Sequence, residues 1–158
     1  MISDINTIAA LDGRLLGVDF GDRRTGLAIS DSAGFLAGGI GSVSPGGIAA
    51  TAREVARIAR EQEAVAAVVG LPRNMDGSEG ARADRCREFA ELLAEEAGIP
   101  VMMTDERLTT VAASRYLNET NTRGKRRKAV IDSLSAEIIL QNTLDRIANI
   151  RSHASANS

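Results

Sequence analysis

The chain has 158 residues, a formal net charge of −2, 44% hydrophobic and 25% charged residues, which is the composition of one soluble globular domain with a sizeable core. Aromatic residues make up only 3%, which argues against a stacking platform for single-stranded nucleic acid, and the acidic balance argues against a wholly basic nucleic-acid binder. One Cys excludes an internal disulfide framework, and because the one His, His153, lies in a polar tail, a Cys/His zinc site and a His-based triad lack the residues they need.

The two ends of the chain differ from the domain that we expect over residues 15–150. Residues 1–14 lack the basic start and apolar core of a secretory signal, and we expect a flexible leader there. Residues 151–158 are small and polar, and we expect a disordered tail. The longest apolar stretch, residues 64–71, is too short to cross a bilayer, so we expect a cytoplasmic protein without membrane contact.

Hydrophobic patterning between these ends alternates between the strand and the helix type. It predicts strands over residues 15–19, 26–30, 35–43, 64–71 and 100–104. It predicts helices over residues 48–62, 81–97, 109–117 and 131–147, with a basic loop over 118–128. An antiparallel meander followed by alternating helices and strands predicts an α/β fold with a five-stranded mixed sheet flanked by helices, in which ligands gather at the carboxyl ends of parallel strands.

Asp19 ends the first apolar strand, directly before Phe20 and Gly21. A buried carboxylate is costly unless it is paired or binds a metal, so this position is a candidate ligand for a hard cation. The alternative is an aspartate that starts a turn or accepts hydrogen bonds from nearby backbone amides. This segment alone does not decide between the two.

Two further acidic positions follow downstream. Asp105 and Glu106 come after the fifth strand, and adjacent strand residues point to opposite faces, so only one of the two can share a face with Asp19. Asp132 precedes the last helix. Taken alone, each of these acids is better explained as part of a helix N-terminus, where Asp and Glu are favoured.

Two segments carry groups that suit a phosphate backbone. Residues 70–80 form a glycine-rich loop after a buried strand, and residues 123–128 form a basic cluster in an otherwise acidic chain. The plain alternative for both is a solvated surface loop. Neither a phosphate-binding Walker loop nor a dinucleotide-binding glycine motif is present.

Taken together, four motifs resemble the YqgF family of RNase H-fold proteins, which are named as pre-16S rRNA nucleases and as Holliday-junction-resolvase-like proteins. The resemblance runs from Leu15 to about Ile147. The motifs are Val18-Asp19-Phe20-Gly21 with Gly26, Gly70-Leu71-Pro72 with Asn74-Met75-Asp76-Gly77, Asp105-Glu106-Arg107-Leu108-Thr109-Thr110, and Asp132-Ser133 with Ser135-Ala136 and Ile138-Ile139-Leu140.

The resemblance implies an RNase H-like three-layer fold and a metal-dependent nuclease that acts in processing the 5′ end of pre-16S rRNA. It implies that Asp19, Glu106 and Asp132 are the catalytic carboxylates and hold Mg²⁺ or Mn²⁺. The side chains expected to hold the nucleic acid are Arg23, Arg24, Arg73, Asn74, Arg107, Lys125, Arg126, Arg127 and Lys128. Ser135 stands where RuvC-type resolvases carry a fourth acid, so the pattern leaves one or two metal ions open.

Other functions remain open on the sequence. The substrate is either RNA or branched DNA, and a chain that acts on branched DNA would be a Holliday junction resolvase. The oligomeric state is either monomer or homodimer. A non-catalytic module that binds rRNA or a protein is a further alternative. A phosphotransferase of the actin and sugar-kinase kind also begins with an Asp-x-Gly hairpin, but it needs two such domains.

Overall fold

A computed structural model describes residues 2–72, 76, 79–105 and 124–156, with side chains in the last range described for residues 133–154. Its centre is a five-stranded sheet in the order β3-β2-β1-β4-β5. The strands are β1 (Arg14–Asp19), β2 (Thr25–Ser30), β3 (Ala37–Val43), β4 (Ala64–Leu71) and β5 (Val101–Asp105). β1 pairs antiparallel with β2, and β2 with β3, whereas β1 to β4 and β4 to β5 are parallel pairs, which confirms the mixed sheet.

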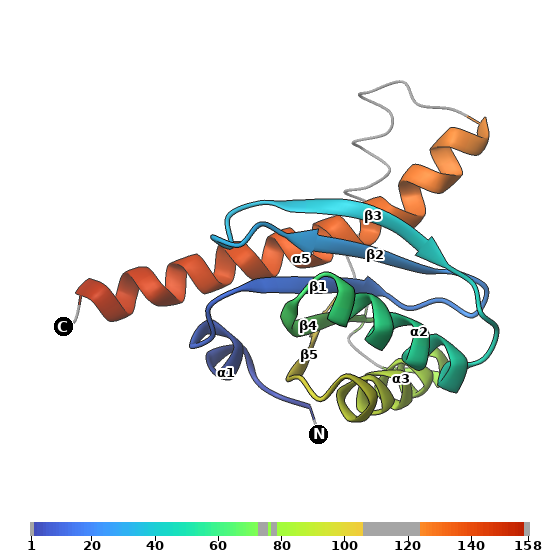
Figure 1. Ribbon diagram of the computed structural model, residues 1–158, viewed down its shortest axis with the longest axis horizontal. Helices are drawn as coiled ribbons and strands as arrows, with labels where there is room; N and C mark the ends of the chain where they lie inside the picture. Colours follow the sequence, from blue (N-terminus) through green and yellow to red (C-terminus); the bar gives the residue numbers. More distant parts are fainter. Residues whose placement is uncertain (1, 73–75, 77–78, 106–123, 157–158) are drawn as a thin grey trace.

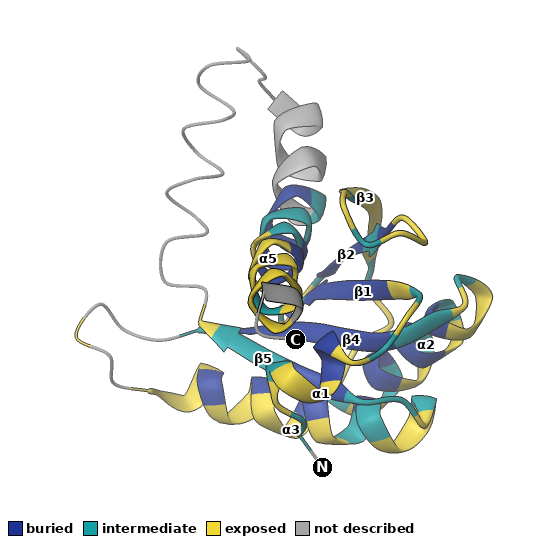
Figure 2. Ribbon diagram, turned by 90° about the vertical axis from the view of Figure 1, so that its left-hand side faces the viewer, coloured by how far each residue is buried: buried dark blue, intermediate teal, exposed yellow. Residues whose placement is uncertain are grey.

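Helices cover both faces of the sheet and give three layers (Figures 1 and 2). Helices α2 (Ile48–Glu61) and α3 (Ala81–Ala97) lie on one face, and α5 (Gly124–Ala156) crosses the other. Each face therefore has its own hydrophobic core. Val18, Val55 and Phe89 belong to the core under α2 and α3, and Leu15 and Leu140 belong to the core under α5.

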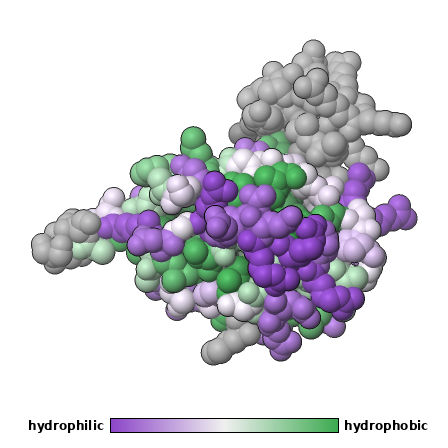
Figure 3. Space-filling view, viewed as in Figure 1, coloured by the Kyte–Doolittle hydropathy of each residue, from purple (hydrophilic) through white to green (hydrophobic). Residues whose placement is uncertain are grey.

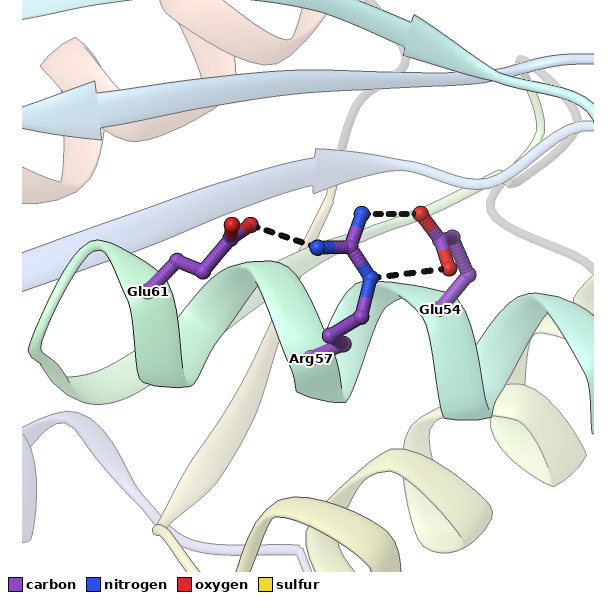
Figure 4. A network of polar contacts seen from close by, with 3 residues as sticks. All are labelled: Glu54, Arg57 and Glu61. Carbon is purple, nitrogen blue, oxygen red and sulfur yellow. Dashed lines mark hydrogen bonds and ion pairs between the residues drawn. The ribbon is translucent and has the colours of Figure 1, made fainter.

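The amphipathic pattern of α2 explains its orientation. Its apolar face, including Val55 and Ala59, is buried, while its outer face carries charged side chains. There, the Arg57 guanidinium donates through Nη1 to Glu61 at 2.7 Å and through Nε to Glu54 at 3.2 Å (Figure 4). The hydrogen bond from Arg57 lowers the pKa of Glu54, so the outer face stays ionised and in water. Helix α3 ends as its sequence predicts, because Gly98 takes the left-handed conformation at φ +67°.

Helix α5 comes unusually close to the sheet at two glycines. A Cβ atom on Gly17 of β1 would stand 2.7 Å from Leu140 Cβ and 2.8 Å from the Ala136 carbonyl oxygen. A Cβ atom on Gly39 of β3 would overlap the Ser133 hydroxyl. The absence of side chains at these positions lets α5 lie directly on the strands.

The structure corrects the expected flexible leader. Residues 5–9 form the short helix α1 (Ile5–Ala9), which begins where the Asp4 carboxylate accepts a hydrogen bond from the Thr7 amide at 2.9 Å. Ile8 is buried in the core under α5, and the Ser3 amide donates to the Val101 carbonyl at 2.7 Å. The leader carries one short amphipathic turn, which is stable only because it packs against the rest of the protein.

The extent of α5 corrects two further expectations. Residues 124–128, expected in a basic loop, lie in its first turns, and residues 151–156, expected in a disordered tail, lie in its last turns. No proline interrupts this segment, and the Arg151 guanidinium donates to the carbonyl oxygens of Ala9 and Leu11 at 3.1 and 2.6 Å. The predicted helix over residues 109–117 lies outside the described residues. Within the described part of the chain, no helix combines the length and hydrophobicity that a membrane span requires.

The close contact at Gly17 can be tested by adding a single methyl group. We expect Gly17→Ala to lower the free energy of unfolding by about 1–3 kcal/mol, because the methyl group meets a backbone oxygen and a Cβ atom that cannot move independently. Urea denaturation measures the change. Gly38→Ala is the matched control, since a Cβ atom on Gly38 has open space around it. Equal stability of both variants would contradict the close approach of α5.

Candidate functional site at the carboxyl end of the sheet

Asp19 lies at the carboxyl end of the central strand β1 and is partly exposed. Its neighbour Val18 packs under α2 and α3, and Gly17 lies against α5, so alternation along the strand directs Asp19 to the α5 face. The predicted acid therefore stands at the edge where the sheet ends, on the side that α5 covers.

One row of residues crosses the sheet at the level of Asp19. Asp19 pairs with Gly26 of β2, which pairs with Ser42 of β3. On the other side, Val18 pairs with Val69, so the register continues from Asp19 to Gly70, and Gly70 pairs with Thr104 of β5. Asp19 is thus flanked by a glycine on each neighbouring strand. No side chain from these two positions occupies the space beside the carboxylate.

The register also separates the two acids at the end of β5. Met102 belongs to the core under α5, and Met103 packs against the opposite core. Alternation then places Thr104 on the face of Asp19 and Asp105 on the opposite face. This agrees with the expectation that Asp105 does not share a face with Asp19. Glu106 lies outside the described residues.

Helix α5 runs antiparallel to β1 above this face (Figure 1). Leu15, near the start of β1, shares a core with Leu144 and Ile147, whereas Gly17 lies against Leu140 and Ala136. Positions nearer the N-terminus of α5 therefore lie over positions nearer the carboxyl end of β1. Residue 132 lies in α5 one turn before Ala136, toward the strand end that carries Asp19.

The turn after Asp19 is held in place on both sides. A Cβ atom on Gly21 would overlap the Arg24 carbonyl oxygen, so a tight turn requires glycine there. Asp22 forms an ion pair with Arg85 of α3 at 2.8 Å. This turn carries two of the predicted nucleic-acid contacts, of which Arg23 is exposed and Arg24 is partly buried.

The remaining predicted site residues lie where side chains are not described. These residues are Arg73, Asn74, Glu106, Arg107, Lys125, Arg126, Arg127, Lys128 and Asp132. Among the described side chains, no three Asp, Glu, His or Cys residues form a group that could hold a metal ion. Of the three predicted carboxylates, only Asp19 is among these described side chains, so the predicted cluster stays a prediction. The carboxylate oxygens of Asp19, flanked by a glycine on each neighbouring strand, are of the type that suits a hard divalent cation such as Mg²⁺ or Mn²⁺.

Glu137 on α5 is an ionisable residue that the sequence analysis passed over. It is partly buried, and this burial raises the pKa of its carboxyl group. It lies one turn after Ser133, which faces Gly39, and one turn before Gln141, which accepts a hydrogen bond from the Ala37 amide at 2.9 Å. The helix thus places Glu137 over β3, two strands away from β1 and Asp19. Only the packing of α5 distinguishes it from the exposed glutamates of other helices.

Comparison with known proteins identifies relatives over most of the chain. A sequence model of the RuvX family, described as "Holliday junction resolvase", matches residues 13–146. A Myxococcus xanthus protein named "Putative pre-16S rRNA nuclease" is 46% identical over 132 residues, covering 84% of this chain and 87% of the relative. A Clostridium novyi protein of the same name is 42% identical over 134 residues, covering 85% and 99% of the two chains.

Solved structures share the fold at low sequence identity. Thermus thermophilus RuvC in complex with Holliday junction substrate superimposes with a TM-score of 0.56 at 15% identity, covering 86% of this chain and 96% of that one. Fowlpox virus resolvase in complex with Holliday junction DNA gives a TM-score of 0.55 at 9% identity, covering 85% and 98%. These likenesses confirm the RNase H-like fold.

The raised pKa of Glu137 predicts how its replacement affects stability. Burial penalises the charged carboxylate in the folded state, so this group destabilises the fold at neutral pH, and the penalty disappears as pH falls below its ordinary value of 4.5. We expect Glu137→Gln to raise the thermal midpoint at pH 7.5, with a difference from wild type that shrinks toward pH 4. Glu95→Gln on the exposed side of α3 is the control and should show no such trend. A midpoint difference that is independent of pH would contradict the burial of this carboxylate.

Proposed function

Because the chain belongs to the RuvX (YqgF) family of nucleases, we propose that it hydrolyses phosphodiester bonds in a metal-dependent reaction and processes the 5′ end of pre-16S rRNA. The observation that carries this proposal is the position of Asp19: an acid at the carboxyl end of a central strand, flanked by Gly26 and Gly70. The names of the relatives support an rRNA substrate, and the matches cover 87% and 99% of the lengths of these two relatives. Cys86, the single cysteine of the chain, is buried, which fits action in the reducing cytoplasm.

The three proposed carboxylates reach the site from three different elements. Asp19 comes from β1, and alternation along the chain after β5 favours Glu106 over Asp105 as its partner. Asp132 would approach from α5, whose antiparallel course brings residue 132 toward the end of β1. Divalent ions held by such a group would activate a water molecule and stabilise the leaving oxygen.

The number of metal ions depends on the residue three positions after Asp132. In this chain that residue is Ser135, which is 9% exposed and offers a hydroxyl instead of a carboxylate. Three acids supply fewer negative charges than four to offset two divalent ions. We therefore propose that at least one metal ion binds tightly through Asp19, Glu106 and Asp132, and that any second ion binds more weakly.

The basic cluster at the start of α5 is proposed to hold the substrate backbone. Lys125, Arg126, Arg127 and Lys128 lie in the first turns of the helix, where the helix dipole adds further positive potential. Positive side chains are unfavourable in the positive potential of a helix N-terminus, and a bound phosphate group would offset this repulsion. Arg23 and Arg24, in the turn after Asp19, would contact the strand nearer to the scissile bond, together with Arg73, Asn74 and Arg107.

A second candidate substrate is branched DNA. The family description names a Holliday junction resolvase, and the two resolvases that share the fold are solved with Holliday junction DNA. A cleavage assay with Mn²⁺ on matched RNA and DNA substrates, including a four-way junction and a pre-16S rRNA fragment, separates the two. Selective cleavage of the junction would favour branched DNA over rRNA as the substrate.

The role of Asp19 can be tested by an isosteric change. We expect Asp19→Asn to fold normally but to lose at least about 100-fold in cleavage rate, because altering groups that merely orient metal ligands already costs about 10–100-fold. The Mn²⁺ affinity, measured by calorimetry, should fall as well. We expect the same two losses for Glu106→Gln.

Asp105→Asn is the matched control, since Asp105 lies on the opposite face of the sheet and should retain both activity and Mn²⁺ binding. If Asp105→Asn lost the metal and Glu106→Gln kept it, the strand register after β5 would differ by one residue from the one proposed. Near-normal cleavage by a folded Asp19→Asn variant would refute a catalytic role for Asp19, whereas a wild type that neither binds Mn²⁺ nor cleaves any substrate would favour the non-catalytic binding module.

The proposed role of the basic cluster makes a prediction about salt. Replacing residues 125–128 with alanine should weaken nucleic-acid binding across all sequences, because phosphate contacts carry no sequence information. Each lost contact should reduce the slope of log K against log salt concentration by about 0.9 on duplex DNA. Fluorescence anisotropy at several salt concentrations measures this slope. An unchanged slope would mean that these residues do not contact phosphate.

A further inference from the structure

Two large apolar side chains stand in solvent at the turn between β2 and β3. Phe35 and Leu36 are each 70% exposed, and the only other large exposed apolar residue among the described ones is Ile40, at 39%. Hydrophobic surface is visible at the upper left of Figure 3, near this hairpin. The two side chains lie at the end of the sheet opposite Asp19, so the proposed nuclease site does not account for their exposure.

The backbone that presents these side chains is held in place. The Asp31 carboxylate accepts hydrogen bonds from the amides of Phe35 and Leu36 at 2.7 and 3.2 Å, and these bonds lower the pKa of Asp31. From the other side, the Gln141 amide of α5 donates to the Phe35 carbonyl at 2.9 Å. The two side chains are therefore displayed in one backbone conformation, which reduces the entropy cost of binding.

A pocket lies directly beside this turn. It has a volume of about 310 Å³, and residues 32–34 of the same turn form one of its walls. The other walls are mainly aliphatic and come from α1, the start of β1 and the end of α5, through Ile8, Leu11, Leu15, Leu144 and Ile147. Asp12, Ser32 and Arg151 add polar groups to the lining. Arg151 is fixed there by its hydrogen bonds to Ala9 and Leu11.

The pocket matches the side chains that protrude next to it. An aliphatic cavity of about 150 Å³ already binds benzene, so a pocket twice as large accommodates a phenyl ring together with part of a leucine side chain. Within one molecule, Phe35 and Leu36 remain exposed and so do not fill this pocket. We propose that the chain forms a symmetric dimer in which Phe35 and Leu36 of each copy enter the pocket of the other.

Two features favour a second copy as the occupant. The protruding side chains and the pocket lie side by side on one molecule, so a two-fold axis between two copies can satisfy both contacts at once. Residues 32–40 contain no Asp, Glu, Lys or Arg, and the pocket lining carries one acid, Asp12, and one base, Arg151, so two copies meet without an excess of like charges.

The area of the contact predicts a weak dimer. A buried aromatic side chain covers about 150–250 Å², so two reciprocal insertions of a phenylalanine and a leucine bury on the order of 1,000 Å² in total. This lies at the lower end of specific interfaces, where complexes are typically transient. We therefore expect a dimer dissociation constant in the micromolar range, so that the dimer forms only at protein concentrations above that range.

Analytical ultracentrifugation of the full chain from about 1 to 500 μM tests the proposal. We expect a concentration-dependent shift from monomer to dimer for the wild type and monomer throughout for the double variant Phe35→Ser, Leu36→Ser. Ile40→Ser is the matched control, because Ile40 lies in the middle of β3, away from the pocket, and should dimerise normally. A wild type that stays monomeric at every concentration would overturn the proposal. Loss of the dimer in Ile40→Ser alone would do so too, because it would indicate pairing through the β3 edge.

A second variant separates side-chain insertion from other modes of dimerisation. Ala33→Trp places a large ring at the pocket wall and should abolish the homodimer while leaving Phe35 and Leu36 in place. A mixture of this variant with the double serine variant keeps one intact pocket and one intact pair of apolar side chains. We expect a weak heterodimer in the mixture and none in either variant alone. If the folded Ala33→Trp variant dimerises as well as the wild type, insertion into the pocket is wrong.

Discussion

The closeness of α5 to the sheet at Gly17 is the constraint on which the rest of the site depends. With only hydrogen on its Cα atom, this residue lets Leu140 and the Ala136 backbone lie against β1. Protein interiors are packed too densely for such a contact to slide, so it fixes the register between helix and strand. That register determines which residues of α5 approach the carboxyl end of β1, and hence whether an acid in the helix can join an acid on the strand.

The sheet has two ends with different chemistry. At the carboxyl end of β1, a partly buried acid stands between two glycines, beside a turn that an ion pair to α3 holds in place. At the opposite end, α1, the end of α5 and the β2–β3 turn surround an apolar pocket. The strands separate the two regions, so changes at the apolar end can be made without altering the groups around Asp19. This separation lets the proposed association be tested independently of the nuclease activity.

The elements that the sequence analysis predicted well are those with a strong local pattern. β4 is a continuous apolar run and matches residues 64–71, and Gly98 ends α3 because only glycine adopts the left-handed conformation there at little cost. The predictions failed where local pattern is weak. The helix α1 has only five residues, and the basic residues at the start of α5 have the composition of a solvated loop. For α1, packing against the rest of the protein supplies the stability that local sequence lacks, and residues 124–128 continue a helix whose later turns pack on the sheet.

The sequence by itself determined the chemical groups: an acid after an apolar strand, glycines beside it, and four motifs in the order of one family. It determined most strands and helices as well, because hydrophobic periodicity is a local property. Only the tertiary structure decided that Asp19, Gly70 and Thr104 share one row, and that Phe35 is exposed although it lies in an apolar segment. Strand register and burial arise from contacts between residues far apart in the chain, and such contacts leave no periodic signal in the sequence.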